Sequence, residues 1–130
     1  MTLFDAGYNI FSGSVDLSRL PTALEFLDLS GNRLSGSVVL TQLPGSLFKL
    51  RLSSNQFSGA LDLTRLPSCL WNLALCYNSF SGTVDLSQLP QGLEELDLSY
   101  NELSGEVIIS DKLCDIVNTE NTNIIKRHRE

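Results

Sequence analysis

The chain has 130 residues, of which 42% are hydrophobic and 18% charged, and its net charge at pH 7 is −6. This length suits about one domain with a buried core. The negative charge argues against a nucleic-acid partner, because phosphate backbones are bound by clustered Lys and Arg. No run approaches the ~18 apolar residues of a membrane span, so membrane insertion is not expected either.

The cysteines and the start of the sequence favour a reducing, cytoplasmic compartment. The three cysteines, Cys69, Cys76 and Cys114, are an odd number. An extended segment between the first two would hold them roughly 20 Å apart, too far for a disulfide. The start MTLFDAGYNIFSG lacks the basic head and apolar stretch of a signal peptide, and no Asn-x-Ser/Thr sequon occurs. A cytoplasmic location is therefore the expectation, unless the chain is an excised fragment.

A 23-residue repeat organises most of the chain. Its asparagines recur at this interval without insertion or deletion, at Asn9, Asn32, Asn55, Asn78 and Asn101. The unit that begins at Leu24 has the pattern LxxLxLxxNxLSGxVxLxxLPxx. A fixed period of this length predicts a solenoid in which each unit packs on its neighbours. The predicted domains are five repeats over residues 1–113 and a non-repeat C-terminal cap or tail over 114–130.

Each unit is predicted to contain two extended segments joined by turns. In the first, the alternation over residues 27–29 points every second side chain inward, as a short strand would. The second is expected over TVDLSQLP (83–90), with Asp85 outward and its two apolar neighbours inward, before Pro90 redirects the chain. The Gly, Pro and Ser of this half leave no room for a regular helix.

The repeated asparagines are predicted to be structural. We expect the side chains of Asn32, Asn55, Asn78 and Asn101 to be buried and bonded to the backbone of their own and the neighbouring coil, with Asn9 in the same register. A simple exposed turn would not require such strict repetition. The Gly of the following LSG or FSG supplies a positive φ for the next bend.

The two ends of the array differ from its middle. The first unit lacks a preceding cap, so an apolar end with an open strand edge is expected. Its exposed side chains would be those of Phe4, Phe11, Val15 and Leu17. Beyond residue 113, an apolar group could fold over the last coil, NTENTN (118–123) is interpreted as a linker, and KRHR (126–129) as a frayed tail or a docking signal.

The strand positions that the repeat leaves free predict a partner-binding face. Their side chains are aromatic and basic in the middle units and acidic at both ends, with Glu25 and Glu94 in the acidic rim. The predicted binding residues are Phe26, Phe48, Lys49, Arg51, Trp71, Tyr77 and Tyr100. Trp, Tyr and Arg most often dominate interface energies. Phe48, Arg51, Trp71 and Tyr77 are expected to form one contiguous patch.

Two local alternatives to a binding role stay open for these residues. The aromatic side chains could simply fold over the edges of their own coils. Arg51 could form only a lateral surface ion pair with Asp28, worth under ~1 kcal/mol.

No catalytic or metal site is predicted. The single histidine, His128, lies outside the repeats, so no Ser-His-Asp or Cys-His arrangement is expected there. Nothing near Cys76 in the sequence would lower its pKa. The spacing of the three cysteines and His128 is unlike compact zinc patterns. We expect buried or inert cysteines, no cofactor, no metal and no enzymatic activity.

The repeat resembles the leucine-rich repeat superfamily, whose signature is LxxLxLxxN. The LSG or FSG followed by V-x-L is similar to the plant-type subclass, with Val-Asp-Leu where that subclass has Ile-Pro, and to repeats of protists, including kinetoplastids. The resemblance covers about 113 of 130 residues. It implies a right-handed, β-rich solenoid whose parallel strands line a concave sheet that binds protein partners, with short extended or turn segments on the convex side and little or no α-helix.

Two functions of different class follow from these observations. The first is a protein-protein interaction module that holds a protein or peptide on the concave sheet. The second is a structural element that forms homo-oligomers through its uncapped N-terminal repeat. Carbohydrate binding is a more distant hypothesis, prompted only by Trp71 and the tyrosines.

Overall fold

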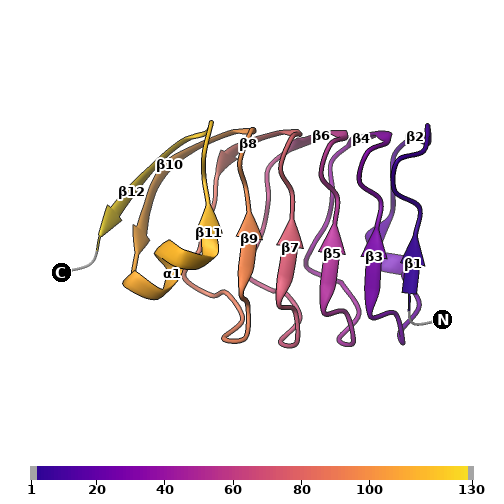
Figure 1. The fold of residues 1–130 in the computed structure, drawn as a ribbon, viewed down its shortest axis with the longest axis horizontal. Helices are drawn as coiled ribbons and strands as arrows, with labels where there is room; N and C mark the ends of the chain where they lie inside the picture. The colour runs from indigo at the N-terminus through magenta and orange to yellow at the C-terminus, as the bar shows by residue number, and fades with distance from the viewer. Residues whose placement is uncertain (1–2, 129–130) are drawn as a thin grey trace.

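The computed structural model describes residues 3–128 and shows a solenoid with two parallel six-stranded sheets (Figure 1). The sheet that faces the viewer, here called the front sheet, contains β1 (Leu3–Asp5), β3 (Phe26–Asp28), β5 (Lys49–Arg51), β7 (Asn72–Ala74), β9 (Glu95–Asp97) and β11 (Val117–Asn118). The second sheet contains β2 (Ser12–Gly13), β4 (Arg33–Gly36), β6 (Gln56–Gly59), β8 (Ser79–Thr83), β10 (Glu102–Ile109) and β12 (Asn123–His128). Helix is confined to η1 (Leu17–Arg19) and α1 (Asp111–Ile116) within the described residues. The predicted fold, a β-rich repeat solenoid, is confirmed.

One apolar core runs between the two sheets. In the front sheet Leu27, Leu50, Leu73 and Leu96 are in register from strand to strand, and all four are buried. Burial of such a side chain contributes roughly 1.5–3 kcal/mol. Because each coil buries its leucines against the next coil, stability accumulates along the array.

The second strand of each coil begins earlier than predicted. In the fourth coil it covers Ser79–Thr83 and ends before the Val-Asp-Leu segment. The predicted inward and outward positions of that segment are correct, since Val84 and Leu86 are buried and Asp85 is exposed. The segment bends because Asp85 Oδ1 accepts a hydrogen bond from the Ser87 N–H at 2.9 Å. The same turn occurs at Asp16 and Asp62.

The repeated asparagines connect each coil to the one before it. Asn55 Nδ2 donates to the carbonyls of Leu52, in its own coil, and Leu29, in the preceding coil, at 3.1 and 3.0 Å. Its Oδ1 accepts the Leu34 N–H of the preceding coil at 3.1 Å. Equivalent bonds occur at Asn32, Asn78 and Asn101.

Burial of these asparagines is less uniform than predicted. Asn32 and Asn101 are buried, but Asn55 and Asn78 are only half-buried, so the expectation of burial is wrong for those two. Asn9 is exposed, and its Nδ2 donates only within its own coil, to the carbonyls of Ala6 and Gly7.

A sixth coil occupies much of the segment predicted to be a tail. Val117 pairs with Leu96, a shift of 21 positions where the other coils shift by 23. The interpretation of residues 118–123 as a linker is wrong, because Asn118 belongs to β11, Asn123 to β12, and residues 119–122 connect the two strands. Residues 126–128 are not frayed, since they pair with β10; residue 129 lies outside the described residues.

Side chains of the α1 region help to cover this end of the core. Val117 is buried, while Leu113 and Ile116 are partly buried and pack against the core. The division of the chain at residue 113 stays an interpretation.

The opposite end leaves apolar side chains exposed. Phe4 is 43% exposed and Phe11 52%. A hollow of about 460 Å³ there is lined mainly by apolar side chains, among them Val15 and Leu20. Leu17, expected to be exposed, is instead buried in η1.

Candidate binding face

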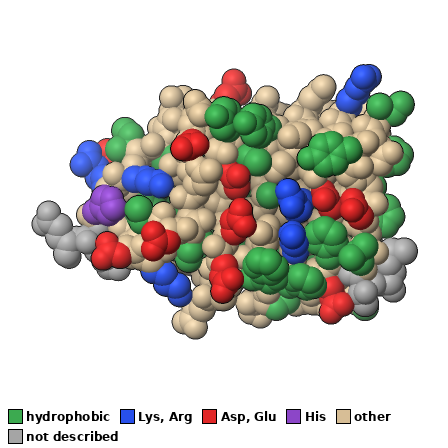
Figure 2. All heavy atoms as spheres, in the orientation of Figure 1, with side chains coloured by type: hydrophobic (Ala, Val, Ile, Leu, Met, Phe, Trp, Pro, Cys, Tyr) green, Lys and Arg blue, Asp and Glu red, His purple; other side chains and the backbone are tan. Residues whose placement is uncertain are grey.

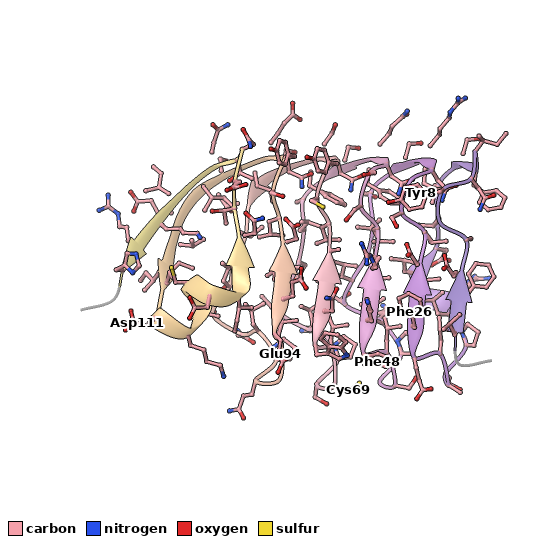
Figure 3. The ribbon with its side chains drawn as sticks, in the orientation of Figure 1. Tyr8, Phe26, Phe48, Cys69, Glu94 and Asp111 are labelled. Atoms are coloured by element: carbon pink, nitrogen blue, oxygen red, sulfur yellow. The ribbon has the colours of Figure 1, made fainter. Side chains whose placement is uncertain are left out.

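Aromatic and basic side chains meet near the N-terminal ends of the front strands. The rings of Phe48 and Trp71 stack with their centroids 6.2 Å apart and an interplanar angle of 7°. Lys49 Nζ lies 5.4 Å from the centroid of Phe26 and 5.7 Å from that of Trp71. Contacts of this kind contribute about 0.5–1 kcal/mol at exposed sites. We call Phe26, Phe48, Lys49 and Trp71 the aromatic–lysine cluster; Figure 3 shows its two phenylalanines low on the front sheet.

The aromatic side chains of this cluster are partly engaged in packing. Phe26 and Phe48 are half-buried, so part of their surface is used in packing. Trp71 remains 37% exposed. The cluster therefore presents a fixed apolar surface with a cation beside it.

The two predicted tyrosines form a second, separate pair. Tyr77 and Tyr100 stack with ring centroids 4.3 Å apart. They follow β7 and β9 and have φ angles of 56° and 55°, in the left-handed region. Tyr77 follows Trp71 by six positions, an extended length of roughly 20 Å. The expectation of a single contiguous patch is therefore wrong, because the aromatic side chains gather at opposite ends of the strands.

Arg51 lies between these aromatic groups without an acidic partner. Its register neighbours are Asp28 on β3 and Ala74 on β7. Asp28 Oδ1 accepts hydrogen bonds from the Ser30 N–H, at 2.9 Å, and from the Ser30 hydroxyl. The lateral ion pair with Asp28 is not formed: among residues 3–128 the ion pairs are Arg19–Asp16 and Arg127–Glu106.

The guanidinium of Arg51 has an unsatisfied donor. Arg51 Nε is buried and has no hydrogen-bond partner within the described part of the chain. Most buried donors in proteins are satisfied, so this N–H is an exception to explain. Figure 2 shows Lys and Arg side chains in the middle of this face, with Asp and Glu on either side.

The acidic side chains of the rim are partly engaged. Asp97 Oδ1 accepts from the Ser99 N–H at 3.0 Å, and Glu95 accepts from Asn72 Nδ2 at 2.9 Å. Glu25 and Glu94 are exposed, and Figure 3 shows Glu94 near the lower end of β9.

Sequence reasoning missed the roles of two small or neutral residues on β7. Ala74 occupies the position held by an aspartate in three other coils, so a small neutral side chain lies between Arg51 and Asp97 in the register. Asn72 Nδ2 donates to Glu95, as described above. The interruption of the aspartate column at residues 51 and 74 is the signal that could have identified this position.

The cysteines and the other possible metal-ligating residues are not clustered in the described part of the chain. Burial raises the pKa of the Cys76 thiol, although its Sγ donates to Ser53 Oγ at 3.1 Å, so the thiol stays protonated at neutral pH. All three cysteines are unpaired, and Cys69 and Cys114 are exposed rather than buried. Within residues 3–128 there is no group of three His, Cys, Asp or Glu that could hold a metal ion. Over the same range no helix is long and apolar enough to cross a membrane.

The sheets and their turns place the chain in the class of parallel β-solenoids built from short repeats. A model of the Leucine Rich Repeat family matches residues 23–43 and 92–114. The solved LRR ectodomain of the receptor kinase SOBIR1 from Arabidopsis thaliana is similar in fold, with a TM-score of 0.79 over 94% of this chain and 70% of that chain, at 23% identity. A comparison with curated proteins found no match. The chain therefore has the fold of a leucine-rich repeat solenoid.

Proposed function

We propose that the protein binds a partner polypeptide on its front sheet, across β3, β5, β7 and β9. The leucine-rich repeat fold is a common protein–protein interaction module, and it is typically non-enzymatic. That this chain binds its partner on the front sheet, and that it has no enzymatic activity, are both part of the proposal.

The observation that carries the proposal is the stacked Phe48–Trp71 pair beside Lys49 and Arg51, two cations that form no ion pair with any residue of the described range 3–128. Tryptophan and arginine in a partly desolvated setting are typical of the residues that dominate interface energies. The acidic rim then favours partners with basic groups at the edges of the contact, which speeds encounter.

Selection of peptides from a display library on the folded protein tests this proposal. A selected peptide should bind Trp71→Ala more weakly than wild type by about 2 kcal/mol or more. Asp85→Ala is the matched control, because Asp85 is exposed and lies outside the front sheet, and it should leave the affinity within error. Equal loss in both variants, or a larger loss from Asp85→Ala, would contradict the proposed location.

Self-association through the N-terminal end is a second candidate function. The observation that favours it is the apolar hollow beside β1, together with the exposed phenyl rings of Phe4 and Phe11. An open strand edge next to such a surface favours pairing with another chain.

A further inference from the structure

We propose that the partner of the front sheet is an extended segment with the pattern basic-x-acidic-x-basic, which crosses the strands with its central carboxylate at Arg51. This inference rests on the proposed function and specifies the chemistry of its partner. It rests on the charges of one row of residues that pair in register across consecutive strands of the front sheet.

The acidic residue at the centre of the proposed segment is inferred from the lack of bonding partners around Arg51. Among residues 3–128 the arginine has no ion pair and its buried Nε–H has no acceptor, while the hydroxyl and amide of Ser30 donate to the Asp28 carboxylate next to it. On its other side is the small side chain of Ala74, where three other coils carry aspartate. A carboxylate that enters above Ala74 can accept hydrogen bonds from the guanidinium, and Lys49 two residues away adds a second positive charge.

The basic residues on either side of that acidic residue are inferred from the aspartates at the two ends of the same row. Register places Asp28, Arg51, Ala74 and Asp97 side by side on consecutive strands. Each aspartate uses Oδ1 for a bond to the serine two residues later. A basic side chain at either end of a crossing segment would therefore meet a carboxylate.

The spacing of the sheet matches that of an extended peptide. Adjacent strands lie ~4.8 Å apart, so Asp28 and Asp97 are about 14 Å apart along the row. An extended chain advances ~3.3 Å per residue, which places residues i and i+4 about 13 Å apart. Residue i+2 then falls about 6.6 Å along the row, between Arg51 and Ala74. Side chains i, i+2 and i+4 of an extended segment also point to the same face.

The alternation of charge argues for a polypeptide over a polyanion. A chain of phosphates would place negative charges against Asp28, Glu95 and Asp97 at the same time as it met Arg51. A single carboxylate between two basic groups avoids that repulsion, because each charge faces its opposite.

Three synthetic peptides test the charge pattern at low ionic strength, where exposed charges are least screened. They share Gly-Ser flanks and a fluorescein label, and their cores are Lys-Thr-Glu-Thr-Lys, Lys-Thr-Gln-Thr-Lys and Glu-Thr-Lys-Thr-Glu. Threonine spacers are chosen because β-branched residues favour extended chain. Fluorescence anisotropy measures the affinity of each for wild type, Arg51→Gln and Arg33→Gln.

The Glu-centred peptide should bind wild type at least about fivefold more tightly than the Gln-centred one, and the charge-reversed peptide should bind most weakly. Arg51→Gln should abolish the preference for Glu over Gln. Arg33→Gln removes the same charge from an exposed position of the second sheet and should preserve the preference. Circular dichroism checks that both variants are folded.

Absence of a preference for Glu over Gln in wild type would overturn the inference, as would equal effects of Arg33→Gln and Arg51→Gln. Library-selected peptides that depend on Trp71 but bind Arg51→Gln normally would overturn the charge pattern alone and leave the proposed function standing. Selected peptides that are indifferent to Trp71 would instead count against the proposed function.

Discussion

At the scale of single residues, the repeated asparagine joins neighbouring coils, because its side-chain amide forms hydrogen bonds with backbone groups of both. Asn55 Nδ2 reaches carbonyls in its own and the preceding coil, and its Oδ1 accepts a preceding N–H. Asn55→Ala should lower the free energy of unfolding by ~1–3 kcal/mol, because these backbone groups lose their partner. Urea denaturation measures the change.

Asn9→Ala is the matched control for that substitution. Asn9 occupies the same register, but it is exposed and its bonds to Ala6 and Gly7 stay within one coil. Its replacement should cost less than that of Asn55. Equal losses, or a change of only a few tenths of a kcal/mol at Asn55, would show that the inter-coil bonds do not stabilise the array.

The aspartate turns predict a loss of stability in acid. Hydrogen bonds from the side chains of Ser18, Thr64 and Ser87, and then from their N–H groups, lower the pKa values of Asp16, Asp62 and Asp85 from the ordinary value of 3.8. A lowered folded-state pKa gives a stabilisation that is complete above the unfolded value and is lost as the pH falls through the folded value.

Urea denaturation from about pH 6 to about pH 2 measures this dependence. The triple variant Asp16→Asn, Asp62→Asn, Asp85→Asn should lose less stability over that range than wild type, because its amide oxygens accept the same bonds without titrating. Identical pH dependence in the two proteins would contradict the role given to these turns.

At the scale of elements, the front strands were predictable because Leu alternation and the 23-residue period both specify them. The second strand was misplaced for a physical reason: Val-Asp-Leu alternates like a strand, but the Asp85 side chain caps a turn. Phe48, Arg51, Trp71 and Tyr77 were expected to form one patch, but Phe48 stacks with Trp71 and Tyr77 stacks with Tyr100.

The sixth coil was not predicted from the sequence because it does not match the repeat pattern. The preceding fifth coil is two residues shorter than the others, and Thr122 stands where the asparagine of the sixth coil would be. Thr122 Oγ1 donates to the Thr119 carbonyl at 2.7 Å, as Asn101 Nδ2 does to that of Leu98 at 3.2 Å. Asn121 has a φ of 54°, close to that of Tyr100. Backbone geometry therefore persists after the side-chain pattern has been lost.

A pair of neighbouring isoleucines tests whether this coil is part of the folded array. Ile124 packs against the core, whereas Ile125 is 54% exposed. Ile124→Ser should lower the free energy of unfolding by about 1–2 kcal/mol, and Ile125→Ser should stay within about 0.5 kcal/mol. Thermal or urea denaturation distinguishes them, and indifference to both substitutions would mean that β12 does not contribute to the core.

At the scale of the whole molecule, the apolar N-terminal end predicts association if the second candidate function is correct. Size-exclusion chromatography with light scattering should then show a mass that rises with concentration. Phe4→Ser should reduce that rise, because Phe4 lines the apolar hollow, while Ile108→Ser on β10 should not. A constant monomeric mass would exclude this association at the concentrations measured.

The front sheet is the face on which the proposed function depends, and chemical-shift mapping of a library-selected peptide on isotope-labelled protein tests it most directly. The account predicts the largest shifts at the amides of residues 48–51 and 71–74, with small shifts at residues 62–64 and 85–87 outside the front sheet. Largest shifts at the latter segments, or shifts confined to the N-terminal end around Phe4 and Phe11, would contradict it.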